Sequence, residues 1–217
     1  MVGICLTAYY ARPNVNFGQI RQIESGGRQL VNAMDLSLRS QSLRWFSGQV
    51  QYTLSRAESN SGGINRFPQD QYNPNAEWGR TNSDRRHTLN LTGTINQDHW
   101  LTLGINVRLN SGAPYTETTG YDDYHTGLGN ARPAGVGRNT LQAAGSANLD
   151  LQWEHDFKLT EGEDDDGKAI SIGIASFNVP NHTNYGGYIG AQNSSRFMQP
   201  TSTSARRQLE FSAGYRF

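Results

Sequence analysis

The stretch Arg207-Gln-Leu-Glu-Phe-Ser-Ala-Gly-Tyr-Arg-Phe217 alternates polar or small residues with apolar ones from Gln208 to its end. Its apolar residues share one parity: Leu209, Phe211, Ala213, Tyr215 and Phe217. A period of two predicts a β-strand with one apolar and one polar face. Because chain ends usually fray into water, a strand that stops on an aromatic ring is more typical of an outer-membrane barrel, whose aromatic residues lie at the membrane interface. The alternative is an edge strand of a β-sandwich that ends in Phe.

The same alternation recurs along the rest of the chain. We expect strands at residues 17–24, 30–39, 46–56, 87–95, 100–110, 148–157, 168–177 and 207–217. These are about eight strands. Several of them have about ten residues, which is the length of a tilted strand that crosses a membrane. The pattern therefore predicts an all-β fold, an antiparallel transmembrane β-barrel segment of about eight strands.

Short and long connections alternate between the expected strands. Long polar stretches occupy residues 57–85, 111–146 and 178–205, and shorter turns separate the other pairs. Outer-membrane barrels have long extracellular loops and short periplasmic turns. We therefore expect the long loops on the outside of the cell. Aromatic residues near the short turns would form one interfacial girdle: Trp45, Phe46, Trp100, Phe157 and Phe217.

Composition excludes several classes of protein. The 217 residues carry 19 basic and 19 acidic side chains, so no basic field favours nucleic acid. Cys5 is the only cysteine, which leaves no disulfide framework within the chain. No run approaches the roughly 18 apolar residues of a membrane helix. Met1–Ala11 is a poor secretory signal, so we expect an N-terminal part to be missing. Residues 1–16 are then a poorly defined segment, and residues 17–217 form the barrel segment.

The sequence offers no catalytic or cofactor motif. Its five histidines show no HExxH spacing, and neither a Gly-x-Ser-x-Gly elbow nor a phosphate loop is present. Asp122, Asp123 and Asn130 carry oxygen ligands that suit calcium, but their spacing matches no EF-hand loop. We therefore predict neither an enzyme nor a metal or cofactor site.

Charged residues on the polar parity of the strands are candidate lumen charges: Arg108, Asp150, Glu154, Glu210 and Arg216. The interior of an outer-membrane barrel is polar, so these side chains would face a wet lumen or a plug. Two interpretations stay open at this point. The charged side chains neutralise one another across strands, or they form a track for a substrate.

Several short motifs in a fixed order carry a resemblance to a known family. They are Ser83-Asp-Arg-Arg-His87, Ser111-Gly-Ala-Pro-Tyr115, Asn130-Ala-Arg-Pro-Ala-Gly-Val-Gly-Arg-Asn139, Asn148-Leu-Asp150, Phe177-Asn178, Asn181-His-Thr-Asn-Tyr185 and Arg206-Arg-Gln-Leu-Glu-Phe211. Together they resemble the C-terminal part of TonB-dependent outer-membrane receptors, in the Oar-like branch that has an N-terminal carboxypeptidase-regulatory-like domain. The resemblance covers residues 20–217. The chain departs from the family at Tyr121–Asn130, where relatives are rich in Asp, Asn and Gly, and at Val179-Pro180.

The resemblance implies a role in nutrient uptake. Such receptors are barrels of about 22 strands with a plugged lumen, and this chain would supply the last third of the wall. The complete receptor imports a bulky nutrient, whereas the plug and the TonB contact lie upstream, so this chain alone would not be transport-competent. The terminal strand, which ends in Phe, also resembles the signal that the barrel-assembly machinery reads in outer-membrane proteins, and the residues that would carry it are Leu209, Phe211, Tyr215 and Phe217. These four residues would face lipid in either case.

Two other function classes remain open on the sequence. One is a stand-alone small outer-membrane barrel with a structural or adhesive role, because eight strands can close around their own side chains. The other is a secreted β-sandwich that binds a partner through its loops. The main reading places the chain in the cell outer membrane, in contact with lipid, the assembly machinery and an unidentified ligand. No nucleic-acid partner is expected.

Overall fold

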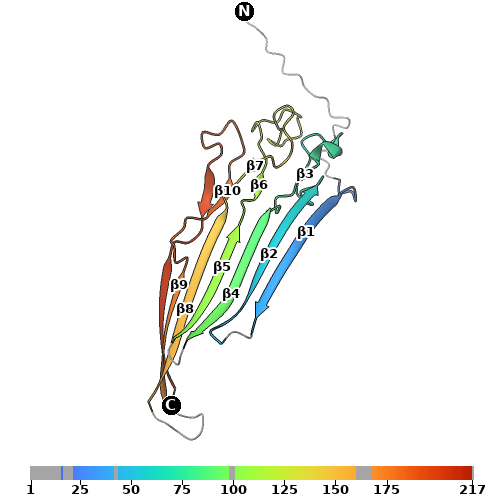
Figure 1. The fold of residues 1–217 in the computed structure, drawn as a ribbon. Coiled ribbons are helices and arrows are strands. Elements are labelled where there is room, and N and C mark those ends of the chain that lie inside the picture. Colours follow the sequence, from blue (N-terminus) through green and yellow to red (C-terminus); the bar gives the residue numbers. More distant parts are fainter. Residues whose placement is uncertain (1–15, 17–21, 42–43, 98–100, 160–167, 217) are drawn as a thin grey trace, which may run out of the picture.

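The computed structural model describes residues 16, 22–41, 44–97, 101–159 and 168–216 (Figure 1). In these residues the chain forms one antiparallel sheet in which each long strand pairs with the next one along the sequence. The seven long strands are β1 (Gln29–Ser40), β2 (Phe46–Ser59), β4 (His87–Gln97), β5 (Leu101–Asn110), β8 (Ser146–Lys158), β9 (Ala169–Phe177) and β12 (Gln208–Arg216). The fold is all-β, as predicted. The sheet is curved and open, with β1 and β12 at its two edges (Figure 1).

The strand register keeps the apolar residues on one face of the sheet. One row of facing residues crosses six strands: Phe46, Ile95, Leu103, Trp153, Ile174 and Phe211. Successive side chains of a strand point to opposite faces, so the rows between carry polar side chains. One such row is Arg39, Gln49, Thr92, Asn106 and Asp150. A shift of one residue in any pair would exchange the two faces, so the hydrophobic pattern fixes this register.

The sheet encloses no apolar core. Among the described residues, the buried apolar side chains are only Ala57, Ala131 and Ala169. Large apolar side chains of the sheet stand in the open instead: Leu38 is 71% exposed and Phe211 is 75% exposed. A soluble sandwich would bury this face against a second sheet. No second sheet covers it in the part of the chain that the structure describes.

The long connections gather at one end of the sheet, opposite the strand ends at Ser40, Phe46, Gln97 and Leu101 (Figure 1). The long connections contain short elements that the sequence did not predict. These are η1 (Pro74–Glu77), β3 (Gly79–Arg80), the pair β6 (Pro114–Tyr115) and β7 (Leu141–Gln142), and the pair β10 (Tyr185–Tyr188) and β11 (Pro200–Thr203). The long loops lie where they were expected, and these short elements within them are additions to the prediction.

The strand limits also differ from the expectation in places. β2 continues to Ser59 because it pairs with β1 on one side and with β3 at its end. Of the strand expected at 17–24, residues 17–21 lie outside the described residues and residues 22–24 belong to no strand. Seven long strands are therefore described where about eight were expected.

None of the described helices is long and apolar enough to cross a membrane.

Candidate functional site

The exposed apolar face of the sheet is the first functional surface. Across the middle of the sheet its rows carry aliphatic and aromatic side chains, for example Leu38, Val50, Leu91, Val107 and Leu149. Charged side chains on this parity occur near the long loops, where Arg56 pairs with Glu58 at 2.6 Å. An apolar band with charges only toward its ends is the outer surface of a transmembrane barrel.

Aromatic residues border this band at the end with the short connections. The rings of Trp45 and Phe46 lie 5.9 Å apart between centroids, and Trp45 is exposed. Phe157 follows Trp153 and His155 on one face of β8 and meets the His155 ring edge-on at 4.6 Å. Trp100 and Phe217, the other members of the predicted girdle, lie outside the described residues.

Two facing glycines make room for the Phe46 ring. Gly48 and Gly93 are partners across β2 and β4. A Cβ atom added at Gly93 would lie 2.7 Å from the ring, and one at Gly48 would lie 2.7 Å from it as well. Phe46 thus covers a part of the sheet that has no side chains of its own, which keeps the apolar band continuous.

The five predicted lumen charges all lie on the polar face. Arg108 faces Asn148, Glu154 faces Gly173, Glu210 faces Ala175 and Arg216 faces Ala169. Asp150 accepts hydrogen bonds from Asn148 Nδ2 at 2.7 Å and from the Asn178 N–H at 2.9 Å. Within the described residues these five charges form no ion pair with one another. Their place in a lumen stays a prediction.

The terminal strand presents Leu209, Phe211 and Tyr215 on the apolar face, where all three are exposed. Phe217 lies outside the described residues. The geometry agrees with lipid contact, and the role of these residues as an assembly signal stays a prediction.

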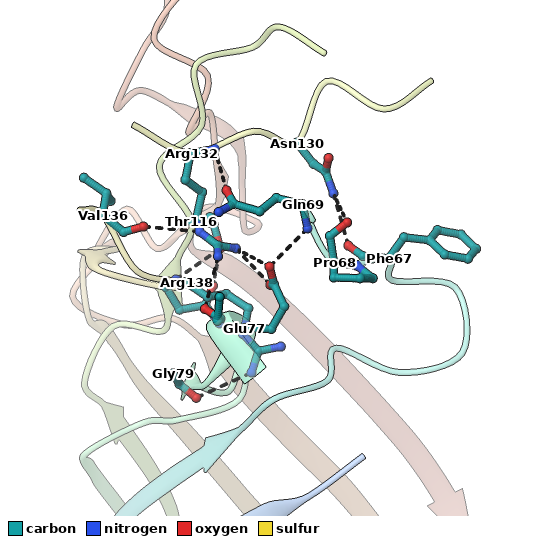
Figure 2. Close-up of polar contacts among 12 residues, drawn as sticks. Phe67, Pro68, Gln69, Glu77, Gly79, Thr116, Asn130, Arg132, Val136 and Arg138 are labelled. Carbon is teal, nitrogen blue, oxygen red and sulfur yellow. Dashed lines mark hydrogen bonds and ion pairs between the residues drawn. The ribbon is translucent and has the colours of Figure 1, made fainter. Parts of the chain in front are cut away.

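The second functional surface is the loop cluster, which we define as residues 60–86 and 111–145. Its centre is a buried ion pair between Glu77 of η1 and Arg132 (Figure 2). Arg132 Nη1 donates to Glu77 Oε1 at 2.9 Å and to Oε2 at 2.8 Å, and the side chains are only 4% and 8% exposed for Arg132 and Glu77. Gln69 links the same two segments, because its backbone N–H donates to Glu77 Oε1 and its side-chain Oε1 accepts from the backbone N–H of Arg132.

Arg138 and Asn139 connect the second loop to β2 and β3. Arg138 Nη2 donates to Ser59 and to the Gly79 carbonyl, and burial lowers the pKa of its guanidinium. Asn139 is 2% exposed, and its Nδ2 donates to the Arg80 carbonyl at 2.6 Å. Its φ of 57° lies in the left-handed region, which Asn tolerates better than most residues.

Asp84 holds the end of the first loop against β2. Its carboxylate is 1% exposed, accepts the Ala57 N–H at 2.8 Å and pairs with Arg80 Nε at 2.6 Å. Arg80 also donates to Gln142 Oε1 at 2.7 Å, which reaches the second loop. Each loop is thus bonded to a strand end and to the other loop.

The third long connection is held in the same way. The Asn184 side chain makes two hydrogen bonds to the backbone of Ala147, at 2.8 and 2.9 Å. Asn178 Nδ2 donates to the carbonyls of His182 and Ala205. Most of the polar residues in these contacts belong to the short motifs of the sequence, to which we had assigned no individual role. The position of these motifs beside the ends of the expected strands was the sequence feature that pointed to such contacts.

The residues weighed for calcium do not converge. Asp122 accepts the N–H groups of Thr126 at 2.8 Å and Gly127 at 2.7 Å, whereas the Asn130 amide donates to the Phe67 carbonyl at 3.1 Å. Burial tends to raise the pKa of Asp122, but the hydrogen bonds from Gly127 and Thr126 outweigh it and lower the pKa. Within the described ranges no three His, Cys, Asp or Glu residues gather as metal ligands.

The chain was compared with protein families, curated proteins and solved structures. No curated protein and no solved structure matches the chain. A family model described as an outer membrane beta barrel domain matches residues 4–136, more than half of the chain. This match agrees with the antiparallel sheet and its exposed apolar face, and it implies the outer membrane as the location. The chain belongs to the outer membrane beta barrel domain family.

Proposed function

We propose that the chain forms part of the barrel wall of a TonB-dependent outer-membrane receptor that imports a bulky nutrient. The long loops then face the cell exterior, and the polar face of the sheet lines the lumen. The observation that carries the proposal is the open sheet, whose two long edge strands each pair on one side only among the described residues.

An open edge is costly in a membrane. Every backbone N–H and C=O in the hydrocarbon region needs a partner, and an unsatisfied group costs several kcal/mol. β1 has twelve residues and β12 has nine, and each pairs on one side only within the described residues. Further strands on both sides would satisfy these edges, as in a larger barrel.

Closure of the seven described strands upon themselves is the less favoured arrangement. Bacterial single-chain barrels have an even number of strands, from about eight upwards. A barrel of about eight strands also needs side chains that fill its interior. The polar face instead has mostly small residues in one row, which runs through Ser47, Thr94, Gly104, Gln152 and Ala175. This arrangement fits a wide lumen better than a packed one.

The TonB-dependent character is supported by the resemblance in the short motifs. In the structure most of these motifs supply contacts that connect the long loops with strand ends, such as Asp84 with Ala57 and Asn184 with Ala147. Ordered long loops at one end of the barrel suit a receptor that captures its ligand there.

The size of the native polypeptide and its contact with TonB test the proposal. The protein would be isolated from outer membranes with an antibody against residues 111–145, after formaldehyde cross-linking of intact cells. We expect a species much larger than the 24.0 kDa of this chain, with TonB attached. A heat-modifiable barrel of about 24 kDa as the only species would contradict the proposal and favour a stand-alone barrel.

The direction of the loops needs a separate test. Tyr72 is 88% exposed in the first long loop, and Arg44 is exposed at a short connection. In a Cys5→Ser background, Tyr72→Cys should react with a membrane-impermeant maleimide on intact cells. Arg44→Cys should react only after the outer membrane is opened. The reverse pattern would place the long loops in the periplasm.

A further inference from the structure

The loop cluster encloses an open cleft of about 600 Å³. Its walls come from the turn at Gly26 and Gly27, from the first long loop and from the second. Three arginines, Arg66, Arg132 and Arg138, and two glutamates, Glu24 and Glu77, lie along it.

One pair of these charges is already neutralised. Arg132 holds both oxygens of Glu77, and the Gln69 N–H occupies one of them as well. Glu24 lies exposed at the rim and accepts a hydrogen bond from Gln22. Among the described residues, therefore, no carboxylate forms an ion pair with Arg66 or Arg138.

Arg138 keeps donors without acceptors. Its Nη2 donates to neutral oxygens of Ser59 and Gly79. Its Nε is buried and has no hydrogen-bond partner, and within the described residues Nη1 makes no hydrogen bond either. Arg138 is half-buried, and a partly desolvated guanidinium without a counter-charge is unfavourable. Burial and the neighbouring Arg132 lower its pKa, and Glu77 offsets this only in part.

Gly62 brings the second arginine to the same place. A Cβ atom added at Gly62 would lie 2.8 Å from Arg66 Cβ and 3.7 Å from Arg138 Nη1. The two arginine side chains therefore flank one glycine at the wall of the cleft. Figure 2 shows Arg138 near the Glu77–Arg132 pair. Its hydrogen bonds to Ser59 and Gly79 hold it there.

We propose that Arg138 and Arg66, on either side of Gly62, bind an anionic group of the ligand, a carboxylate or a phosphate, in the cleft of the loop cluster. Guanidinium groups bind both anions with charge-assisted hydrogen bonds. The inference deepens the proposed receptor function by naming the ligand class. It rests on that function in one respect, namely that the ligand reaches the loop cluster from outside the cell.

Calorimetry on the native polypeptide, purified in detergent, tests the site. The probes are malonate, inorganic phosphate and malonamide, the neutral analogue of malonate, all at one ionic strength. We expect malonate or phosphate to bind at least about tenfold more tightly than malonamide, which corresponds to one charge-assisted hydrogen bond. The anion that binds more tightly identifies the anionic group of the ligand as a carboxylate or a phosphate. Equal or absent binding of all three would overturn the proposal.

Variants locate the binding. Arg66→Gln should weaken anion binding about tenfold, because this side chain makes no hydrogen bond to the described residues and its loss leaves the loops intact. Arg138→Gln should weaken it at least as much. Arg44→Gln, which removes a positive charge at the other end of the sheet, is the control and should change nothing. Unchanged affinity in the Arg66 and Arg138 variants would refute the site.

The two proposals fail separately. Binding of malonate or phosphate by the purified polypeptide needs neither TonB nor an energised cell. Absence of TonB from the cross-linked material would leave the calorimetric result standing. Absence of anion binding would leave the receptor assignment standing.

Discussion

Arg132 Nη1 reaches both carboxylate oxygens of Glu77, at 2.8 and 2.9 Å, across 55 residues of sequence. The pair joins the first and second long loops at a point where the side chains are only 4% and 8% exposed. Removal of one partner would leave the other charged and buried, which costs about 3–5 kcal/mol. We therefore expect Arg132→Met to lower the thermal stability of the loop cluster strongly and to speed hydrogen exchange there.

The matched control is the exposed ion pair of Arg56 and Glu58. Its distance of 2.6 Å is as short, but the Arg56 side chain is largely in solvent, and exposed ion pairs contribute little to stability. Arg56→Met should therefore change exchange in the loops little. If both variants behaved alike, the Glu77–Arg132 pair would not hold the loops together.

The second prediction concerns the glycines under Phe46. Gly93→Ala would place a methyl group 2.7 Å from the ring, and an overpacked position costs about 1–3 kcal/mol. Urea unfolding in lipid vesicles should show this loss. The additional change Phe46→Leu should recover part of it, because the two positions are in contact and their effects are not additive.

Gly104→Ala provides the comparison within the same sheet. A Cβ atom there would lie 3.5 Å from its nearest neighbour, an ordinary contact. This variant should unfold close to the parent. Equal losses of stability in the Gly93 and Gly104 variants would mean that the cost comes from replacing a strand glycine as such and not from a clash with the Phe46 ring.

The sheet could be read from the sequence because its information is local. Alternation along each strand determines which side chains share a face, and the register follows once one face must be apolar. Trp153, Ile174 and Phe211 fall in one row for this reason. A strand pattern alone does not state how many neighbours a sheet has. The expectation of an open segment of a larger barrel came from the family resemblance, and the described sheet is open at β1 and β12.

The interior of the loops could not be predicted. Its contacts join residues far apart in sequence, such as Asn139 with Arg80 and Arg138 with Ser59. Neither partner shows periodicity, and each looks like an ordinary polar loop residue until the other is beside it. The motifs around Arg132 and Asn139 marked the right segments, but only the fold shows what these side chains contact.

The third prediction is a pH dependence in the second long loop. Hydrogen bonds from Gly127 and Thr126 lower the pKa of Asp122 below its usual value. A carboxyl group with a lowered pKa stabilises the folded loop above its unfolded value of about 3.9, and the effect is lost as pH falls through the folded value. Exchange protection of the Gly127 N–H, corrected for intrinsic rates, should be constant near neutral pH and fall only below about pH 4. Loss of protection between pH 5 and 7 would contradict this.

The fourth prediction separates assembly from lipid contact in the terminal strand. Phe211 of β12 faces Ile174, and Ile172 is a similarly placed lipid-facing residue on β9. If β12 carries a signal for the assembly machinery, Phe211→Ser should reduce the folded protein in cells several-fold more than Ile172→Ser does. Both should refold alike in vesicles. Equal losses in cells would leave Phe211 as a lipid contact alone.

The last prediction tests which face meets lipid. Leu91 lies in the middle of β4 on the apolar face, between Val50 and Val107, and its neighbour Asn90 points to the other face between Gln51 and Arg108. Arginine at a lipid-facing position near the membrane centre costs about 2–4 kcal/mol. Leu91→Arg should therefore destabilise the barrel by this amount in vesicles, as measured by urea unfolding. Asn90→Arg, one residue away, should cost much less, since its side chain would enter a wet interior. If Asn90→Arg were the more damaging change, the two faces of the sheet would have to be exchanged.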